Sequence, residues 1–315
     1  MSSIRAVVVD PSVSGRLAIR EVDYPSAKPN EAVVRVHAIS LNRGEVRRAS
    51  MAEAGWRPGW DLAGIVEKEA ADGSGPRRGA RVVGMVDFGA WAEVVAVPTA
   101  NLAELPASVS FAQAATLPVA GLTALRTLEK GGLLLERRVL ITGASGGVGH
   151  FACQLARNAG AHIVGVVRQA SSEAIAEEAG AQQVVVSEDL SEAREFGPYD
   201  LILDSVGGHS LGNALSMIAP NGVCVNFGAS EAPEVTFDIR RFYMTGGATL
   251  YGFYLFHELT HNPGAKDLGR LASMIAESRL RPRIDVEAPW TEIGDLVQKL
   301  MERRITGKAV LHLEN

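Results

Sequence analysis

A glycine-rich turn constrains the fold of this 315-residue chain more than any other feature. The run 139–142 is apolar and rich in β-branched residues, which predicts a strand. The sequence GASGGVG follows at 143–149, and apolar side chains then return at helical spacing as far as residue 159. This order of strand, glycine turn and helix predicts the first unit of a parallel α/β sheet.

The glycines of this turn suggest what it binds. Without a Cβ they permit a tight turn, let a pyrophosphate approach the backbone and let the helix pack close to the strand. The free N–H groups and the dipole of the helix start attract an anion. Ala144 stands where the first glycine of a GxGxxG turn would be. We therefore expect a dinucleotide cofactor whose pyrophosphate lies against Gly146, Gly147 and Val148; packing alone is the alternative.

The rest of the chain divides into a β-rich part and an α/β part. Short strands separated by glycine and proline are expected at 4–9, 17–22, 31–39, 62–67, 80–85 and 91–97. In the α/β part, strands that alternate with helices are expected at 139–142, 162–167, 183–186, 200–204, 223–227 and 249–252. Helices at 264–280 and 291–301 and a strand at 309–313 suggest that the chain returns to its first domain. The sequence therefore predicts two domains. One is formed by residues 1–117 together with 259–315, and the other by residues 118–258.

Composition excludes several classes of protein. The chain is 47% hydrophobic and only 21% charged, so it can bury large cores. Its net charge of −5 argues against a general binder of nucleic acid or acidic membranes. Two cysteines, Cys153 and Cys224, allow neither a disulfide framework nor a cysteine-rich zinc site. Neither a signal segment nor a membrane-spanning run is recognisable, which predicts a cytoplasmic protein without membrane partners.

Several motifs in order along the chain carry a family resemblance. Besides the glycine turn they are 40–45 (SLNRGE), 58–64 (PGWDLAG), 89–93 (GAWAE), 117–124 (LPVAGLTA), 203–208 (LDSVGG) and 306–311 (TGKAVL). With them the sequence resembles the zinc-independent quinone oxidoreductase branch of the medium-chain dehydrogenase/reductase superfamily. The resemblance implies a doubly wound Rossmann sheet, a GroES-like β domain completed by the C-terminus, a nicotinamide cleft where they meet, and a homodimer formed through the last Rossmann strand.

Two departures bear on the chemistry. Zinc alcohol dehydrogenases of the same superfamily carry Cys and His-Glu where this chain has residues 42–44 and 60–61, and their four-cysteine lobe is absent. Catalytic zinc takes three protein ligands, so we expect no metal. The second departure is Glu45, where quinone reductases usually carry Asp, beside a loop at 51–57 that is shorter than theirs. This departure leaves the substrate open.

The end of the second Rossmann strand decides which cofactor is expected. Arg168 follows that strand, and no carboxylate that would accept the ribose hydroxyl of NAD occurs before Glu173. A guanidinium can pair bidentately with a 2′-phosphate, which favours NADPH. Ser172 and Ser187 match family positions near the same phosphate. A solvated surface arginine is the alternative.

The resemblance supplies further site residues. Asn42 matches a residue beside the nicotinamide ribose and the substrate, and it is the candidate polar group at the reacting centre. Thr123 and Lys308 match family contacts of the cofactor, against the alternatives of a buried helix threonine and a plain surface lysine. Further candidate cofactor contacts follow strand ends, where ligands lie in open α/β sheets, with core packing as the alternative for the two phenylalanines: Ser205, Phe227, Gly228 and Phe253. Trp60 and Tyr254 are candidate apolar walls for a flat substrate.

Together these observations predict an NADPH-dependent reductase that transfers hydride to a quinone or another electrophilic conjugated carbonyl. An enone or enoyl-thioester reductase and a non-catalytic NADPH-binding sensor remain alternatives, and RNA binding is disfavoured by the net charge. Arg43, Arg47, Arg48 and Arg57 form a basic cluster that could attract an acidic substrate such as an acyl-CoA or could be a solvated helix face.

Overall fold

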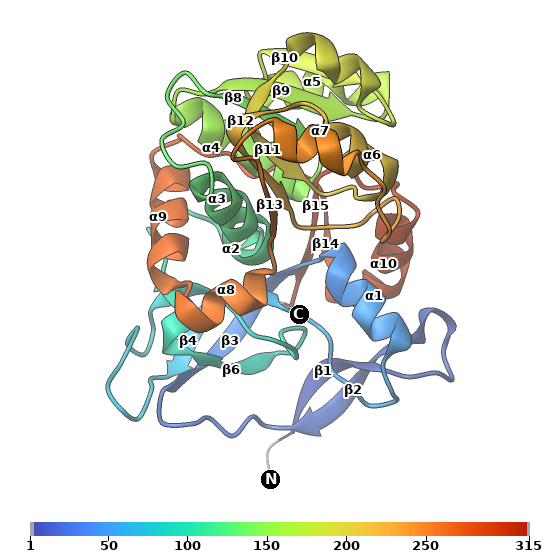
Figure 1. The fold of residues 1–315 in the computed structure, drawn as a ribbon. Helices are drawn as coiled ribbons and strands as arrows, with labels where there is room; N and C mark the ends of the chain where they lie inside the picture. The colour runs from blue at the N-terminus through green and yellow to red at the C-terminus, as the bar shows by residue number, and fades with distance from the viewer. Residues whose placement is uncertain (1–2, 314–315) are drawn as a thin grey trace. The chain divides into compact units, whose positions relative to one another are not determined.

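The computed structural model describes residues 3–313 and divides into two compact units (Figure 1). Unit 1 extends to Leu122 and resumes at Leu259, and unit 2 comprises Thr123–Glu258. The division therefore falls after Leu122, whereas the predicted one fell after residue 117. The functional assignment of the two parts stays a prediction.

Unit 1 is built on a seven-stranded sheet with strand order β14-β15-β3-β4-β5-β7, in which β6 also pairs with β3. A separate antiparallel pair is formed by β1 and β2. The strands are β1 (Ser3–Val9), β2 (Leu17–Asp23), β3 (Glu31–Ser40), β4 (Asp61–Lys68), β5 (Arg81–Met85), β6 (Val94–Pro98), β7 (Leu102–Glu104), β14 (Ile284–Pro289) and β15 (Lys308–His312). The helices are α1 (Arg43–Met51), α2 (Phe111–Ala115), α9 (Ala265–Ala276) and α10 (Ile293–Met301). Short turns are Ser14–Arg16, Thr99–Asn101, the π-helical Leu117–Gly121 and Trp290–Glu292.

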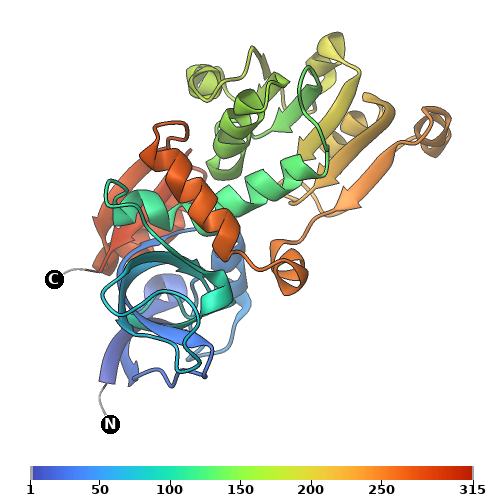
Figure 2. The same cartoon turned by 90° about the vertical axis from the view of Figure 1, so that its left-hand side faces the viewer.

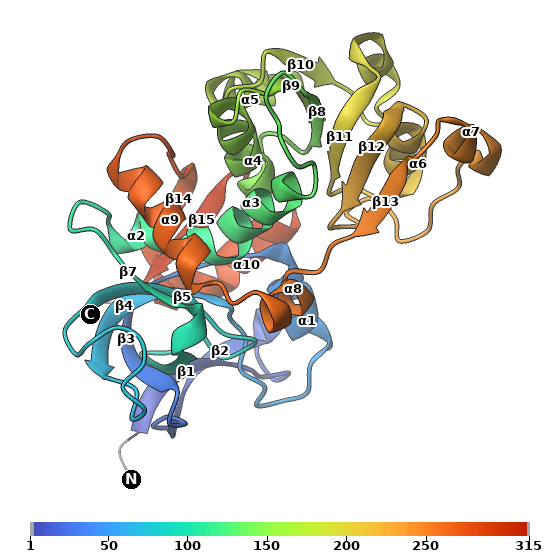
Figure 3. The ribbon, with the colours of Figure 1, turned by 60° about the vertical axis from the view of Figure 1, so that its left-hand side comes forward.

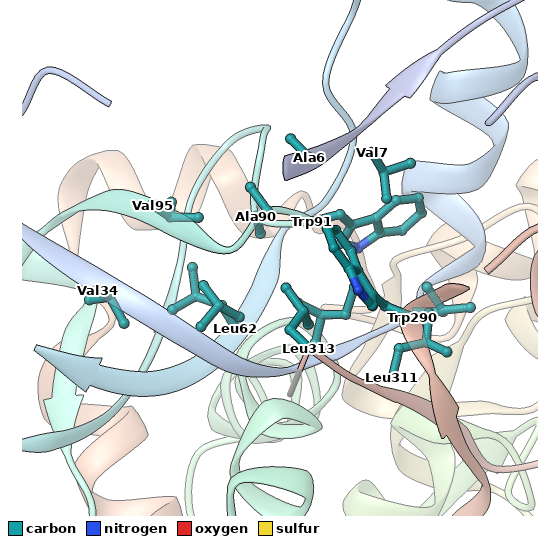
Figure 4. Packing of buried hydrophobic residues seen from close by; sticks show 14 of the residues in the cluster. Ala6, Val7, Val34, Leu62, Ala90, Trp91, Val95, Trp290, Leu311 and Leu313 are labelled. Atoms are coloured by element: carbon teal, nitrogen blue, oxygen red, sulfur yellow. The ribbon is translucent and has the colours of Figure 1, made fainter. Parts of the chain in front are cut away.

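The C-terminal segment completes unit 1. Strand β15 pairs antiparallel with β3, so residues 38–40 and 310–312 lie side by side. In Figure 2 the C-terminal part of unit 1, coloured orange to red, lies against its blue-to-teal N-terminal part. The core joins both parts of the chain, because Trp91 from the first part and Trp290 from the second pack in one cluster with Leu311 and Leu313 (Figure 4). Burial of these large side chains ties the tail to the sheet.

Unit 2 is a six-stranded parallel sheet with strand order β10-β9-β8-β11-β12-β13 (Figure 3). Its strands are β8 (Arg138–Thr142), β9 (His162–Val167), β10 (Gln183–Val186), β11 (Tyr199–Asp204), β12 (Ile218–Asn226) and β13 (Thr249–Gly252). Its helices are α4 (Gly147–Asn158), α5 (Glu173–Glu178), α6 (Gly208–Leu215) and α7 (Ile239–Met244), with 3₁₀ turns at Ala170–Ser172 and Ser191–Phe196. Helices α3 (Leu122–Glu129) and α8 (Leu255–His261) cross the unit boundaries.

The strand order places a switch point between β8 and β11. From β8 the chain winds outward through β9 and β10, then returns to lay β11 on the other side of β8. Ligands of open α/β sheets bind outside the carboxyl ends of the strands at such a point. The predicted doubly wound parallel sheet, together with a β-rich part, is confirmed.

Three features differ from the expected elements. Helix α8 and strands β7 and β14 were not predicted, because short elements carry little periodic signal. The predicted strand at 91–97 begins only at Val94, since the N–H groups of Ala90 and Trp91 are engaged by the carbonyls of Gly59 and Pro58. The helix expected at 264–280 ends at Ala276.

Candidate functional site

The glycine turn has the geometry of an anion-binding site. Gly143 has φ +62°, and a Cβ on Gly149 would lie 2.2 Å from the Gly143 carbonyl oxygen, so the helix approaches the turn as only glycine allows. The first helical hydrogen bond runs from His150 N to Gly146 O at 2.8 Å. The N–H groups of the three residues at the start of α4, 147–149, therefore have no carbonyl within the helix, and these residues fit a dinucleotide pyrophosphate.

Polar groups surround the switch point next to this turn. The Thr142 hydroxyl at the end of β8 accepts a hydrogen bond from Ser205 N at 2.9 Å. Asp204, buried at the end of β11, accepts hydrogen bonds from Gly207 N and from Asn226 Nδ2. Burial raises the pKa of the Asp204 carboxyl, although these donors favour its ionised form. Asp204 thereby fixes the loop between β11 and α6, on which the predicted contact Ser205 lies.

The predicted adenosine contacts follow β9 and β10. Arg168 comes directly after β9, is exposed and makes no hydrogen bond or ion pair within the described residues. Ser187 N bonds the Val167 carbonyl at 3.0 Å, and Ser172 N bonds the Gln169 carbonyl at 2.9 Å, so all three predicted residues flank the end of β9. The Ser187 hydroxyl donates to Asp189, which places a carboxylate beside it.

The remaining predicted contacts of unit 2 occupy similar positions. Phe227 and Gly228 follow β12 and Phe253 follows β13, where Phe253 N bonds the Asn226 carbonyl at 2.8 Å. Phe253 and Thr123 are buried, whereas Tyr254 is 62% exposed. The structure thus brings the predicted residues of this unit to the carboxyl edge of one sheet, apart from Thr123 in α3, and their contacts with a cofactor stay predictions.

Unit 1 holds a buried polar cluster, here called the Asn42 cluster, made of Asn42, Glu45, Asp61 and Lys308. Asn42 caps α1, Glu45 lies in its first turn, and Asp61 and Lys308 begin β4 and β15. The strand register brings them together, because Ser40 pairs with both Asp61 and Val310. Glu45 and Asp61 are completely buried and Lys308 is 4% exposed, so Lys308 is not the plain surface lysine that was the alternative.

Hydrogen bonds fix the orientation of the Asn42 amide. Its Nδ2 donates to Asp61 Oδ2 at 2.8 Å and to Glu45 Oε1 at 3.0 Å, while Lys308 Nζ donates to Asn42 Oδ1 at 2.6 Å. Because an ammonium only donates and a carboxylate only accepts, the amide cannot be turned the other way. Both amide hydrogens are used, and Oδ1, which accepts from Lys308, also faces the backbone N–H of Glu45 in a capping box. The side chain therefore has no donor left for an oxygen that gains charge.

The two carboxylates of the cluster are held by further donors. Glu45 accepts from Asn42 N at 2.6 Å and from Trp60 N at 2.7 Å, and Asp61 accepts from Val119 N at 3.0 Å. Burial raises the pKa of Glu45 and of Asp61 and lowers that of Lys308, while the opposite charges within the cluster act against each of these shifts. The cluster is rigid because nearly every polar atom in it has a partner.

Glu45 and Asp61 were not identified as site residues from the sequence. The spacing of Asn42 and Glu45 was a detectable signal, since an N-cap residue followed three positions later by Glu is a capping pattern. A carboxylate at the start of the apolar strand β4 was a second signal, because an acid buried there needs donors. Trp60, 9% exposed, packs its ring against Gly44 and donates from Nε1 to the Asp87 carbonyl at 3.0 Å.

Family models match both parts of the chain. An alcohol dehydrogenase GroES-like domain matches residues 28–107, and a family described as zinc-binding dehydrogenase matches residues 147–270. The term zinc-binding belongs to the description of that family. Within residues 3–313 of this chain, no group of three or more His, Cys, Asp or Glu side chains could hold a metal ion.

Relatives align over most of this chain. A tomato 2-methylene-furan-3-one reductase is 27% identical over 92% of this chain and 74% of its own length. An Arabidopsis chloroplast envelope quinone oxidoreductase homolog is 26% identical over 92% of each. A zebrafish synaptic vesicle membrane protein VAT-1 homolog is 26% identical over 92% of this chain, which spans 66% of that protein.

Solved structures share the fold. A quinone oxidoreductase from Pseudomonas syringae is 27% identical with a TM-score of 0.83, covering 98% of this chain and 99% of its own. A mycobacterial protein solved in complex with NADPH is 24% identical with a TM-score of 0.83, over 98% and 99% of the two chains.

The fold, the glycine turn and these matches define the chain as a nicotinamide-dependent oxidoreductase of two-part architecture. It belongs to the medium-chain dehydrogenase/reductase superfamily, in its quinone oxidoreductase branch. Across the described part of the chain, the helices are too short or too polar to cross a bilayer.

Proposed function

We propose that this protein is an NADPH-dependent, zinc-independent reductase of a quinone or another conjugated carbonyl compound. The observation that carries the proposal is the glycine turn at the switch point of unit 2, with free N–H groups at the start of α4. The names of the relatives support the substrate class, since they include a quinone oxidoreductase homolog and a furanone reductase.

NADPH is proposed over NADH because of the groups at the end of β9. Arg168 is exposed there without a partner among the described residues, so its guanidinium is available for a 2′-phosphate. The carboxylate of Asp189 beside Ser187 acts against the phosphate, and we expect a moderate preference.

The bound nicotinamide would supply the hydride, and this chain's residues would bind and orient it. The start of α4 would hold the pyrophosphate, and the Asn42 amide would contact the nicotinamide ribose. Lys308 and Asp61 act through Asn42 by fixing its amide. A donor to the oxygen that gains charge must come from elsewhere, which agrees with a substrate that draws its proton from solvent.

Two other functions make different predictions. An enone or enoyl-thioester reductase would use the same cofactor site, and the furanone reductase among the relatives favours this alternative. A sensor would bind NADPH without turnover. Oxidation of NADPH followed at 340 nm with a quinone panel, an enone panel and an enoyl-CoA panel separates the three. Gly147→Asp, which blocks the pyrophosphate position, is the matched control.

A quinone panel with rates well above those of the other two supports the proposal. Higher rates on enones or enoyl-CoA would narrow the proposed substrate class to that of the first alternative. Measurable NADPH binding without turnover on any panel would favour the sensor.

A homodimer through β13 is also proposed. This strand is one of the two edges of the unit 2 sheet (Figure 3). Leu250 on it is exposed, as are Ile239, Tyr243 and Met244 of α7. An open edge beside exposed apolar side chains favours pairing with a second copy. Light scattering should show a dimer in the native protein and a monomer in Leu250→Lys; a native monomer would contradict the proposal.

A further inference from the structure

Two arginines of unit 1 are half-buried and have no counter-charge. Arg43 begins α1 and Arg57 lies in the loop before β4. Neither makes an ion pair or a hydrogen bond within residues 3–313, and the Nε of Arg57 is buried without a partner. Burying a guanidinium is costly unless an anion compensates it.

The position of Arg57 is fixed by its surroundings. The three residues that follow it are paired with the segment 86–91, through Trp91 N to Pro58 O, Ala90 N to Gly59 O and Val86 N to Trp60 O. Its side chain runs along Gly89, where a Cβ would lie 3.9 Å from Nε and from Nη2. Burial lowers the pKa of Arg57, and no carboxylate acts to raise it. The guanidinium is therefore held in place without a charge to neutralise it.

Arg43 lies in a more positive environment. Burial lowers its pKa first, and the charges of Arg303 and Arg47 lower it further. It also occupies the first position of α1, where the helix dipole disfavours a cation. Both effects destabilise the charge at this position, and a bound anion would relieve both.

Both arginines are close in the chain to the predicted substrate contacts. Arg43 directly follows Asn42, and Arg57 precedes Trp60 by three residues, a span of at most about 11 Å even when extended. The bond from Trp60 N to Glu45 Oε2 at 2.7 Å joins these two stretches. The indole ring of Trp60 lies against Gly44, between the two stretches.

We propose that Arg57 binds an anionic group carried by the substrate, a carboxylate or a phosphate attached to the conjugated carbonyl compound. This inference rests on the proposed function. It narrows the substrate class from quinones and conjugated carbonyl compounds in general to those that carry an anionic group. A guanidinium and a carboxylate form a charge-assisted pair, and the burial of Arg57 limits screening by salt.

The test compares a carboxylate-bearing enone with its methyl ester, so that only the charge differs. Steady-state kcat/KM for both compounds gives a ratio of acid to ester for the native protein, Arg57→Gln and Arg57→Lys. We expect a ratio above one in the native protein, a fall of about ten- to hundredfold in Arg57→Gln, and partial retention in Arg57→Lys. Arg47→Gln, which removes the same charge from an exposed position of α1, is the matched control and should leave the ratio within about twofold.

Binding of the two compounds without cofactor, followed by tryptophan fluorescence, keeps the test independent of turnover. Absence of turnover on both compounds would exclude enones from the proposed substrate class, while tighter binding of the acid than of the ester would still support the anion site. An acid-to-ester ratio near one in the native protein, or a ratio unchanged in Arg57→Gln, would overturn the inference. It would also be overturned if Arg57→Gln weakened NADPH binding as strongly as binding of the acid, since the anion would then belong to the cofactor.

Discussion

The Asn42 cluster of unit 1 and the glycine turn of unit 2 differ in whether their polar groups have hydrogen-bond partners within the protein. In the cluster, Lys308, Asp61 and Glu45 occupy both hydrogens and one lone pair of the Asn42 amide. In the turn, three consecutive backbone N–H groups are left without a carbonyl. The cluster satisfies itself, whereas the turn requires a partner from outside.

This difference separates stability from affinity. Removing a member of a saturated buried cluster leaves its partners without hydrogen bonds, so the free energy of unfolding falls. Changing a residue of the open turn removes nothing that the folded protein uses, so the loss appears in ligand binding. The four predictions below follow this distinction from the largest expected effect to the smallest.

Lys308→Met should have the largest effect, because it removes the only cation of the cluster and leaves two buried carboxylates. We expect the free energy of unfolding to fall by about 3–5 kcal/mol near pH 8, measured by urea unfolding. Both carboxyl groups would then have folded pKa values raised further above their unfolded values, a direction already set by burial. The folded state would bind more protons, so the electrostatic part of the deficit should be absent below the unfolded pKa and grow as pH rises through the folded values. The loss of the hydrogen bonds to the Leu41 carbonyl and to Asn42 should remain at every pH.

Lys28→Met is the control for this variant, since Lys28 is 77% exposed and pairs with Glu31 at 3.7 Å. It should leave stability almost unchanged. A deficit in Lys308→Met that is no larger than in the control, or that does not vary between about pH 4 and pH 8, would contradict the interpretation of the cluster.

Gly147→Asp tests the open turn. A carboxylate at the first position of α4 would repel the pyrophosphate, and we expect NADPH affinity to fall by about a hundredfold or more. Acidic residues are favourable in the first turn of a helix, so the unfolding midpoint should be retained. Gly147→Ala adds the Cβ without the charge and should lose much less affinity. Native affinity in the Asp variant would place the nucleotide elsewhere.

Arg168→Ala should weaken NADPH binding and leave NADH binding nearly unchanged. A guanidinium–phosphate pair contributes roughly 1.5–3 kcal/mol, or about ten- to hundredfold, and exposure of Arg168 favours the lower figure. Raising the salt concentration should reduce the native preference, and Arg168→Lys should keep part of it. Titration of both cofactors measures this. Equal losses for the two cofactors would make Arg168 structural, and native preference for NADH would refute the cofactor assignment.

Chelation should have no effect on turnover. The chain lacks the cysteine and histidine ligands of the zinc enzymes at residues 42–44 and 60–61, so elemental analysis should find no stoichiometric zinc. One tightly held zinc per chain, lost together with activity on chelation, would reopen alcohol oxidation as the reaction.

The sequence alone determined the parts of the fold that local patterns encode. The run 139–149 specified a strand, a turn and a helix start, because β-branched residues, glycines and helical spacing each act over a few residues. Regular alternation of strands and helices specified the parallel sheet of unit 2 in the same way. Resemblance over short motifs was enough to indicate the superfamily.

The tertiary structure alone decided what the polar residues of unit 1 do. Lys308 is separated from Asn42 by 266 residues, and only the pairing of β15 with β3 places its ammonium on the Asn42 amide. That contact fixes which way the Asn42 amide faces, although its sequence position suggested only a polar group. The same holds for Arg57, whose lack of a counter-charge depends on which residues pack around it. Hydrogen-bond direction and charge balance are properties of neighbours in space, so a local sequence pattern cannot encode them.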